Sequence, residues 1–139
     1  MKKTKLCIFA VLFLLCLSLS SCGLFGVNYE KYAKQLDEEI YDGDATYPSY
    51  SGIMKKLGDE AIDCTFYYGS EANRFGNVVA VKGCKSREEI LDKINNGETV
   101  EGIKIYIMGN VARSVKYTTI TAEDIKDISK EYSDIMNGN

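Results

Sequence analysis

The sequence predicts a small α+β domain in which two β-hairpins form a four-stranded antiparallel sheet that packs against helices. Two observations lead to this prediction. Strand-like segments occur as two consecutive pairs, and helix-like segments with apolar stripes precede, separate and follow these pairs. The expected order of elements is therefore α-α-β-β-α-β-β-α, with the helices on one face of the sheet.

Two helices are expected at the start of the domain, over residues 28–41 and 48–57. Asn28 suits the N-cap of the first helix, which carries an apolar stripe at helical spacing. The stripe consists of Tyr29, Ala33, Leu36 and Ile40. Pro48 suits the first turn of the second helix, and Gly58 suits the position just past its end. The apolar side chains of this second helix are Tyr50, Ile53, Met54 and Leu57.

The first hairpin is expected from residues 61–68 and 77–83, because both segments are rich in β-branched and aromatic residues. The connection between them, residues 69–76, begins and ends with glycine and is predicted to be a loop. In such a hairpin Cys64 and Cys84 would lie roughly opposite each other.

A third helix is expected to run from the N-cap Ser86 to about residue 95. The run Ser86-Arg87-Glu88-Glu89 matches a capping box, in which the first and last side chains satisfy each other's backbone amides. A last helix is expected from Thr121 to about residue 136. Its apolar stripe would be Ile125, Ile128, Tyr132 and Ile135.

The second hairpin lies between these two helices. Residues 102–108 alternate, with three isoleucines on one face, and therefore predict a strand. Gly109-Asn110 is a strong signal for a tight hairpin turn. Residues 111–118 would form the returning strand. One face of that strand is expected to carry Val111, Arg113, Val115 and Tyr117.

The first 21 residues have the layout of an export signal. Three lysines occur among the first five residues, residues 6–17 are an apolar run, and Leu19-Ser20-Ser21-Cys22 follows. This layout resembles the bacterial lipoprotein signal peptide with its lipobox, which implies type II cleavage before Cys22 and acylation of that cysteine. Two alternatives stay open: an ordinary secretory peptide with a chance cysteine, and an uncleaved anchor. The apolar run is short for an anchor, because a spanning helix needs roughly 20 apolar residues.

The lipoprotein resemblance implies a signal peptide (1–21) and a lipidated tether (22–28). The length of the remaining chain suits a single α+β domain (29–139). The tether reaches at most about 25 Å, so we expect the domain close to the membrane. Two or three acyl chains would hold it durably, because each buried methylene contributes about 0.8 kcal/mol. The expected location is a lipid anchor on the extracytoplasmic face of a cell membrane. Gly23 replaces the Asp of an inner-membrane retention signal, which is compatible with the outer membrane of a two-membrane cell.

Removal of the signal would make the chain more acidic. The full chain has 17 basic and 20 acidic residues, and three of the basic residues precede residue 22. The mature net charge is therefore 14 minus 20, or −6. An acidic surface disfavours nucleic acid and anionic lipid headgroups, so no nucleic-acid partner is expected.

Cys64 and Cys84 are the two cysteines that remain once the signal and the lipidated residue are set aside. In an exported, oxidising setting such a pair predicts a disulfide, which would contribute roughly 3 kcal/mol. The alternative is two small buried thiols. The chain has no histidine, so a structural zinc site is not expected, and the sequence implies no cofactor.

A second resemblance covers about residues 46–118. A short helix ending in Leu57-Gly58, a hairpin, and the run of residues 105–114 are similar to small bacterial lipoproteins of the BamE/SmpA and beta-lactamase-inhibitor-protein-like group. This similarity implies two helices packed against a sheet and a role in an envelope complex or as an inhibitor. The expected helices over 86–96 and at the C-terminus depart from that pattern, so no binding residue is transferred from it.

The residue types needed for common catalytic sites are missing. Without histidine, a Ser-His or Cys-His nucleophile pair cannot form, and no glycine-rich phosphate loop occurs. Adjacent carboxylates such as Glu38-Glu39 point about 100° apart on a helix and do not face each other. Asp42-Gly43-Asp44 lacks the rest of a calcium loop and is interpreted as a polar turn. We therefore expect a protein that is not an enzyme.

Tyrosine is the remaining positive signal, since the chain contains ten tyrosines and no tryptophan. Tyr67, Tyr68, Arg74 and Phe75 gather at the end of the first hairpin, and these residue types often anchor interfaces. We interpret them as a protein-binding site, although strand alternation requires one of the two tyrosines to pack inward. The predicted function is a non-catalytic domain that binds an envelope protein. The alternative is a small-molecule or ion-binding lipoprotein, which needs a pocket of roughly 300 Å³ or more.

Overall fold

The computed structural model describes residues 26–42, 47–129 and 132, and only the backbone of residues 70–72. The expected signal peptide, Cys22, and residues 130–131 and 133–136 of the expected C-terminal helix lie outside the described residues. None of the helices in the described ranges has both the length and the apolar character that a membrane crossing requires.

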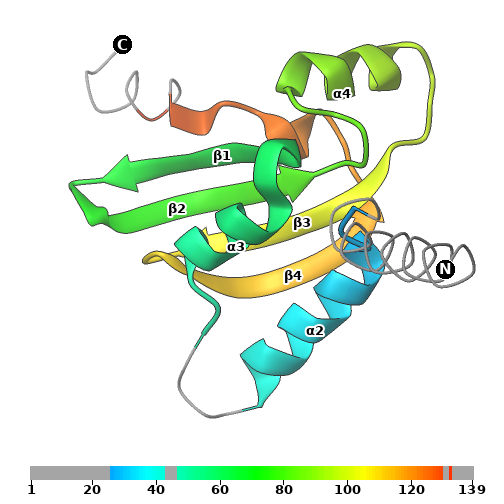
Figure 1. The fold of residues 1–139 in the computed structure, drawn as a ribbon. Coiled ribbons are helices and arrows are strands. Elements are labelled where there is room, and N and C mark those ends of the chain that lie inside the picture. Colours follow the sequence, from blue (N-terminus) through cyan, green and yellow to red (C-terminus); the bar gives the residue numbers. More distant parts are fainter. Residues whose placement is uncertain (1–25, 43–46, 130–131, 133–139) are drawn as a thin grey trace, which may run out of the picture.

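The described chain forms an α+β fold, as predicted (Figure 1). Its helices are α2 (Tyr29–Tyr41), α3 (Tyr50–Leu57) and α4 (Arg87–Asn95). Its strands are β1 (Ala61–Tyr68), β2 (Ser70–Ala80), β3 (Glu101–Met108) and β4 (Val111–Thr119). Two short 3-10 turns cover Gly58–Glu60 and Glu123–Ile125.

The four strands form one antiparallel sheet in the order β1-β2-β3-β4. β1 turns into β2 at Gly69, whose φ is 75°. β3 turns into β4 through Gly109 and Asn110, which both have positive φ, as a tight hairpin turn requires. The predicted sheet of two hairpins is thus confirmed.

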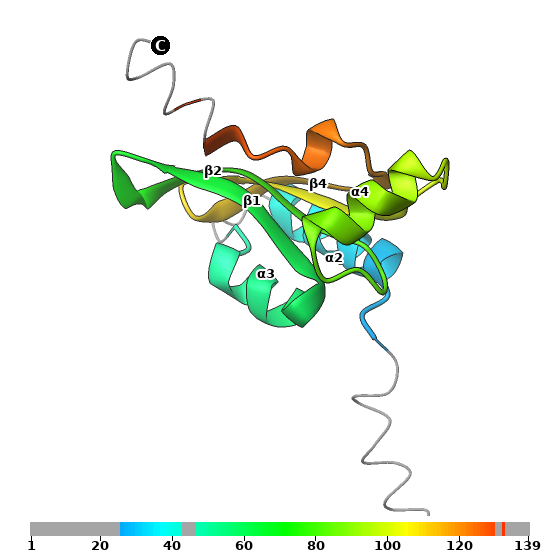
Figure 2. The ribbon, with the colours of Figure 1, turned by 90° about the horizontal axis from the view of Figure 1, so that it is seen from above.

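Helices cover both faces of this sheet (Figure 2). α2 and α3 pack on one face, here called the α2 face, over a core that includes Val78 and Ile105. α4 and residues 120–125 pack on the other face, here called the α4 face, over a core that includes Val79 and Ile90. The expectation of helices on one face is wrong, because consecutive residues of β2 point to opposite faces and both faces are buried.

β2 is longer than the sequence predicts, because it begins at Ser70 and includes most of the expected loop 69–76. Gly76 lies inside the strand with φ 124° and pairs with Thr65. A Cβ atom there would lie 2.8 Å from the Cys64 carbonyl oxygen, so this glycine permits a close backbone approach. The glycine that suggested the end of a loop is therefore a strand residue.

Helix starts agree with the sequence in part. α3 begins at Tyr50, so Pro48 precedes the helix instead of lying in its first turn, and the cap is Ser49, whose Oγ accepts a hydrogen bond from Gly52 N. Ser86 caps α4 as predicted, with its Oγ accepting from Glu89 N. In a capping box the Glu89 carboxylate would accept a hydrogen bond from Ser86 N. Here it accepts one from Lys85 N, one residue earlier.

The expected helix from Thr121 begins differently. Residues 123–125 form a single 3-10 turn, and Lys126 already has an extended backbone. The Asp124 carboxylate accepts hydrogen bonds from Thr121 N and Oγ1 at 2.9 Å, which holds this turn closed. Farther along, residues 128, 129 and 132 are helical, as expected, whereas residues 130–131 and 133–136 of the expected helix lie outside the described residues.

Candidate functional site

The hairpin end of β1 and β2 carries aromatic side chains on both faces of the sheet. Tyr67 pairs with Arg74 and Phe66 pairs with Phe75 in the register of the two strands. Because strand neighbours alternate, Tyr67 and Arg74 lie on the α2 face, whereas Tyr68 and Phe75 lie on the α4 face. The structure therefore divides the predicted four-residue binding site into two separate groups.

Arg74 is the centre of the group on the α2 face, and the residue is only 8% exposed. Its guanidinium carbon lies 3.9 Å from the centre of the Tyr50 ring and 4.2 Å from that of the Tyr67 ring. Nη1 donates to Asp63 Oδ2 at 3.1 Å and to Thr65 Oγ1 at 2.5 Å, and Nη2 donates to the Tyr67 hydroxyl. These five residues, Tyr50, Asp63, Thr65, Tyr67 and Arg74, are called the Arg74 cluster below.

Asp63 supplies the negative charge of the Arg74 cluster. It accepts hydrogen bonds from the Tyr50 hydroxyl at 2.6 Å and from Thr65 Oγ1 at 2.6 Å. Burial alone would raise the pKa of this carboxyl, but the hydrogen bonds from Thr65 and Tyr50 and the charge of Arg74 lower it below its ordinary value. Burial, together with the bond to Asp63, raises the pKa of Tyr50 to about 12. These shifts favour the charged carboxylate and the neutral phenol beside the Arg74 guanidinium.

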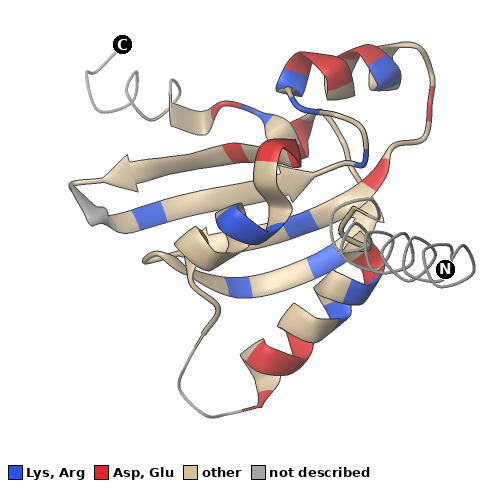
Figure 3. Ribbon diagram, viewed as in Figure 1, with Lys and Arg blue, Asp and Glu red and all other residues tan. Residues whose placement is uncertain are grey.

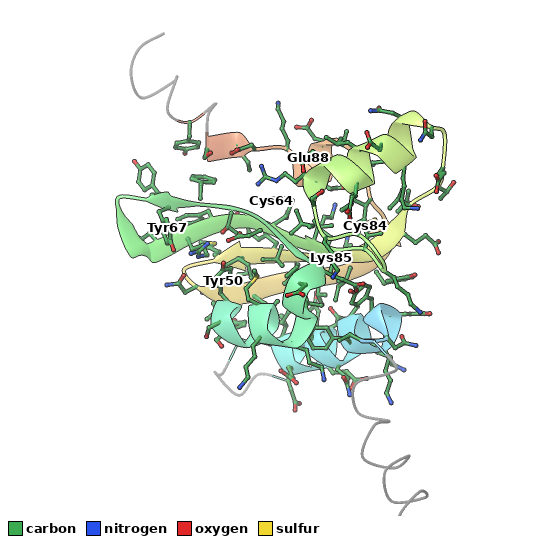
Figure 4. All side chains as sticks on the ribbon, turned by 45° about the horizontal axis from the view of Figure 1, so that its top comes forward. Tyr50, Cys64, Tyr67, Cys84, Lys85 and Glu88 are labelled. Atoms are coloured by element: carbon green, nitrogen blue, oxygen red, sulfur yellow. The ribbon has the colours of Figure 1, made fainter. Side chains whose placement is uncertain are left out.

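Arg74 is not available to a partner, which corrects its predicted binding role. Its two terminal nitrogens are bonded within the fold, and its Nε is buried without a hydrogen-bond partner. Tyr67 is 51% exposed, but one ring face and the hydroxyl contact Arg74. Figure 4 shows Tyr50 and Tyr67 on the side of the sheet where α3 packs.

The group on the α4 face forms a shallow groove of about 500 Å³, called the aromatic groove below. It is lined by Phe66, Tyr68, Phe75, Gly76, Tyr106, Ile128 and Tyr132. The ring centres of Phe66 and Tyr132 are 4.9 Å apart, and Tyr68 meets Tyr132 edge to face at 6.0 Å. Tyr68 is 50% exposed, and Tyr106 and Met108 beside it are also exposed.

The aromatic groove stays open because α4 covers only the other half of this face. Ile90 of α4 is fully buried in the core beneath the helix. Beyond it, Ile125 is buried and Lys104 Nζ contacts Asp124 Oδ1 at 2.5 Å, which fixes the segment that follows β4. Arg87 Nη1 contacts Asp127 Oδ2 at 3.3 Å. This segment then brings Ile128 and Tyr132 to the wall of the groove.

The chemistry of the aromatic groove is that of a contact surface. Its lining contains no charged side chain, and the polar groups that it offers are tyrosine hydroxyls. Among the described residues, no group of three or more His, Cys, Asp or Glu side chains is arranged to hold a metal ion. A larger hollow of about 790 Å³ lies beside α2 and is lined mainly by polar and acidic side chains.

The edge of β1 is closed at its centre. Arg87 Nη2 donates to the Asp63 carbonyl oxygen at 2.9 Å, and Thr65 N donates to Asp63 Oδ1 at 3.0 Å. The outward-pointing backbone groups at this position are therefore already bonded within the chain.

Cys64 and Cys84 are both free thiols in the structure, so the predicted disulfide is absent from it. The expected opposition of the two residues is wrong, because Cys64 pairs with Asn77 and Cys84 follows the end of β2. Figure 4 shows the two cysteines apart along the sheet. Both are buried in the core of the α4 face, and burial raises the pKa of each thiol.

Comparison of the chain with protein-family models, with curated proteins and with solved structures found no match. Sequence reasoning identified Tyr68 and Phe75 but missed Phe66, Tyr106 and Tyr132. A signal for Phe66 was available, because it lies two residues before Tyr68 on the same strand and therefore on the same face of the sheet.

Proposed function

We propose that this chain is a membrane-anchored bacterial lipoprotein whose domain binds another protein at the cell envelope through the aromatic groove. The observation that carries this proposal is the group of half-exposed aromatic side chains on the half of the α4 face that α4 does not cover. The lipobox-like run ending at Cys22 supports the anchor.

Aromatic side chains suit protein binding because they offer large, rigid contact areas at low entropic cost. Three of the seven residues that line the aromatic groove are tyrosines, whose hydroxyls can hydrogen-bond a partner backbone while their rings pack against its side chains. Since the lining has no charge, a partner is expected to present an apolar or aromatic segment rather than an acidic or basic one.

A non-catalytic role agrees with the residues around the groove. The chain has no histidine, and Asp63, a carboxylate of the same hairpin, is engaged by Arg74, Tyr50 and Thr65 on the opposite face. The negative net charge disfavours nucleic acid as the partner.

Site-specific photo-crosslinking in the native cells tests the binding surface. A photoreactive residue at Tyr68 or Tyr106 should capture one protein, whereas the same residue at Tyr41, which is 80% exposed on α2, should not. Equal capture from Tyr41, or no capture from the two groove positions, would contradict the proposal.

Intact mass of the protein purified from its cells tests the anchor separately. Cleavage before Cys22 and a mass increase equal to a diacylglycerol, with or without a further acyl chain, is the expected result. The Cys22→Ser variant should lack the added mass. A chain that keeps its first 21 residues, or one cleaved elsewhere, would contradict the lipoprotein assignment.

A second candidate function is capture of a small apolar ligand. The volume of the aromatic groove, about 500 Å³, is within the range of roughly 300–1,000 Å³ found for ligand sites. Side chains such as Tyr68 are half exposed, however, so the groove is open to water and would not enclose a small ligand. Crosslinking separates the two functions, because a protein partner is captured as a discrete product and a small ligand is not.

A further inference from the structure

We infer that the anchored domain stands on the membrane with the start of α2 toward the lipid headgroups, and that it contacts them through Lys82 and Tyr117. The inference rests on the proposed lipid anchor at Cys22. It adds to the proposed function an orientation and a second contact surface, whose partner is the phospholipid headgroup layer itself.

The length of the tether limits where the membrane can lie. Among the described residues, Val27 is the first that packs against the core of the α2 face, and it is five residues from Cys22. Five residues span at most about 18 Å even when fully extended. The surface around Val27 must therefore stay within that distance of the acylated cysteine.

That surface carries side chains suited to a headgroup layer. A hollow of about 470 Å³ is lined by Gly26, Val27, Asn28, Tyr29, Glu30, Lys82 and Tyr117. Tyr117 is 40% exposed, and tyrosine is enriched at membrane interfaces because its ring is apolar and its hydroxyl is polar. Lys82 is exposed, makes no ion pair within the described part of the chain, and can offer its ammonium group to a phosphate.

The charges along α2 favour the same orientation (Figure 3). Lys31 and Lys34 lie in its first half, with Glu30 as the acidic residue there. Its second half and C-cap carry four carboxylates, which are Asp37, Glu38, Glu39 and Asp42. Carboxylates at a helix C-terminus oppose the helix dipole by about 0.3–1 kcal/mol each, so helix stability does not account for them.

A tilted or flat domain would bring these carboxylates against the membrane. α2 has 13 residues and is therefore about 20 Å long, which exceeds the Debye length of about 8 Å at physiological salt. When the start of α2 faces an anionic membrane, the carboxylates at its other end lie beyond most of the electrostatic repulsion from the lipid. In a flat orientation the same carboxylates lie within range of that repulsion.

The same orientation places the aromatic groove away from the lipid. Tyr117 pairs with Ile103 at one end of the sheet, and Phe75 pairs with Met108 at the other. Five residues of β3 separate these two positions, which corresponds to about 17 Å. The groove would thus point outward, where a protein partner can reach it.

Fluorescence of single-tryptophan variants tests this orientation, because the natural chain has no tryptophan. The lipidated Tyr117→Trp and Tyr41→Trp proteins are reconstituted into vesicles of equal parts zwitterionic and anionic phospholipid, with bromine on the acyl carbons nearest the headgroup. The Tyr117→Trp protein should lose emission to the bromine and shift to shorter wavelength. The Tyr41→Trp protein, altered at the acidic end of α2, should do neither.

A charge pair of variants tests the contact with phosphate. Lys82→Glu in the Tyr117→Trp background should reduce the quenching, while Lys55→Glu, at an exposed position on α3, should leave it unchanged. Equal quenching of the two tryptophan variants, or none in either protein, overturns the inference when both proteins sediment with the vesicles. If the proteins do not sediment with the vesicles and Cys22 is unmodified, the proposed anchor is overturned instead.

Discussion

At the hairpin end of the sheet, tyrosines lie on both faces but in different environments. On the α2 face, Tyr50 and Tyr67 enclose the Arg74 guanidinium, and their hydroxyls complete its network with Asp63. On the α4 face, Tyr68 and its neighbours contact one another but enclose no charge, and water reaches them. Adjacent tyrosines, Tyr67 and Tyr68, therefore differ in role because the strand turns them to different faces.

The difference also separates what stabilises the domain from what is free to bind. A buried cation needs its countercharge and hydrogen-bond partners in place, so each member of the Arg74 cluster is needed by the others. The aromatic groove has no such mutual requirement. Its side chains can therefore be changed one at a time without leaving a buried charge unpaired.

The largest effect is expected from Arg74→Leu. The change removes the cation from between two rings and leaves Asp63 without its countercharge, so the free energy of unfolding should fall by about 3 kcal/mol. Urea unfolding followed by circular dichroism measures it. Arg113→Leu is the matched control, because the Arg113 guanidinium carbon lies 4.3 Å from the centre of the exposed Tyr47 ring. Its loss should stay below about 1 kcal/mol, and equal losses in both variants would refute the assignment.

A smaller effect, with a characteristic pH dependence, is expected from Asp63→Asn. At neutral pH the change should cost about 2 kcal/mol, because Arg74 keeps its hydrogen bonds but loses its countercharge and Asp63 is partly exposed. The folded-state pKa of Asp63 lies below its ordinary value of 3.8, so the unfolded chain takes up the proton first as pH falls. The stabilisation is present above pH 3.8 and is lost as pH falls below it through the folded-state pKa.

The measurement is the free energy of unfolding of both proteins across this pH range. Asp63→Asn should make the decline below pH 3.8 shallower, without abolishing it, since the pKa values of Asp124 and Asp127 are also lowered. An unchanged slope would mean that Asp63 does not stabilise the fold through its charge.

The pair Tyr67→Ser and Tyr68→Ser compares the two faces directly. Tyr67→Ser should lower the free energy of unfolding by about 1–2 kcal/mol through lost ring and hydroxyl contacts with Arg74, and leave partner capture intact. Tyr68→Ser should cost less than about 1 kcal/mol and weaken binding to the captured protein about tenfold. Titration calorimetry with that protein gives the affinities. The reversed result would exchange the roles assigned to the two faces.

The smallest effect is expected from salt. Because no charged side chain lines the aromatic groove, raising ionic strength from about 0.05 to 0.5 M should change the partner affinity only slightly. A steep loss of affinity would show that charges outside the groove, such as the carboxylates of α2, dominate binding.

Local signals in the sequence were enough to predict most elements of the fold. Gly109 and Asn110 marked the second hairpin, and Ser86 marked the start of α4, because these residue types have strong local conformational preferences. The lipid anchor at Cys22 also depends on a local signal, and it stays a prediction.

The remaining features depend on contacts between distant segments. The register shift between Tyr106 and Ile107 rotates β4, so that Ala112 and Val115 are its buried residues instead of the expected alternating set. Likewise, the position of Tyr132 beside Phe66 follows from the ion pairs that fix residues 124–127. No pattern within either segment alone contains that information.

The exposures of Tyr67 and Tyr68 are nearly the same, 51% and 50%, and do not distinguish their roles. What distinguishes them is the partner on each face, Arg74 for one and Tyr132 for the other. The residue types marked this hairpin as a candidate binding site. Only the strand register shows which of its side chains enclose Arg74 on the α2 face and which line the aromatic groove on the α4 face.

The closed centre of the β1 edge has a consequence for crowding. Molecules held by lipid share one plane and one orientation, so their sheet edges meet far more often than those of freely tumbling proteins. The bonds from Arg87 to the Asp63 carbonyl and from Thr65 to the Asp63 side chain occupy the groups through which a neighbouring copy would add its own strand. If the proposed lipid anchor at Cys22 is correct, a dense population on one membrane would thereby be protected from pairing edge to edge at this position.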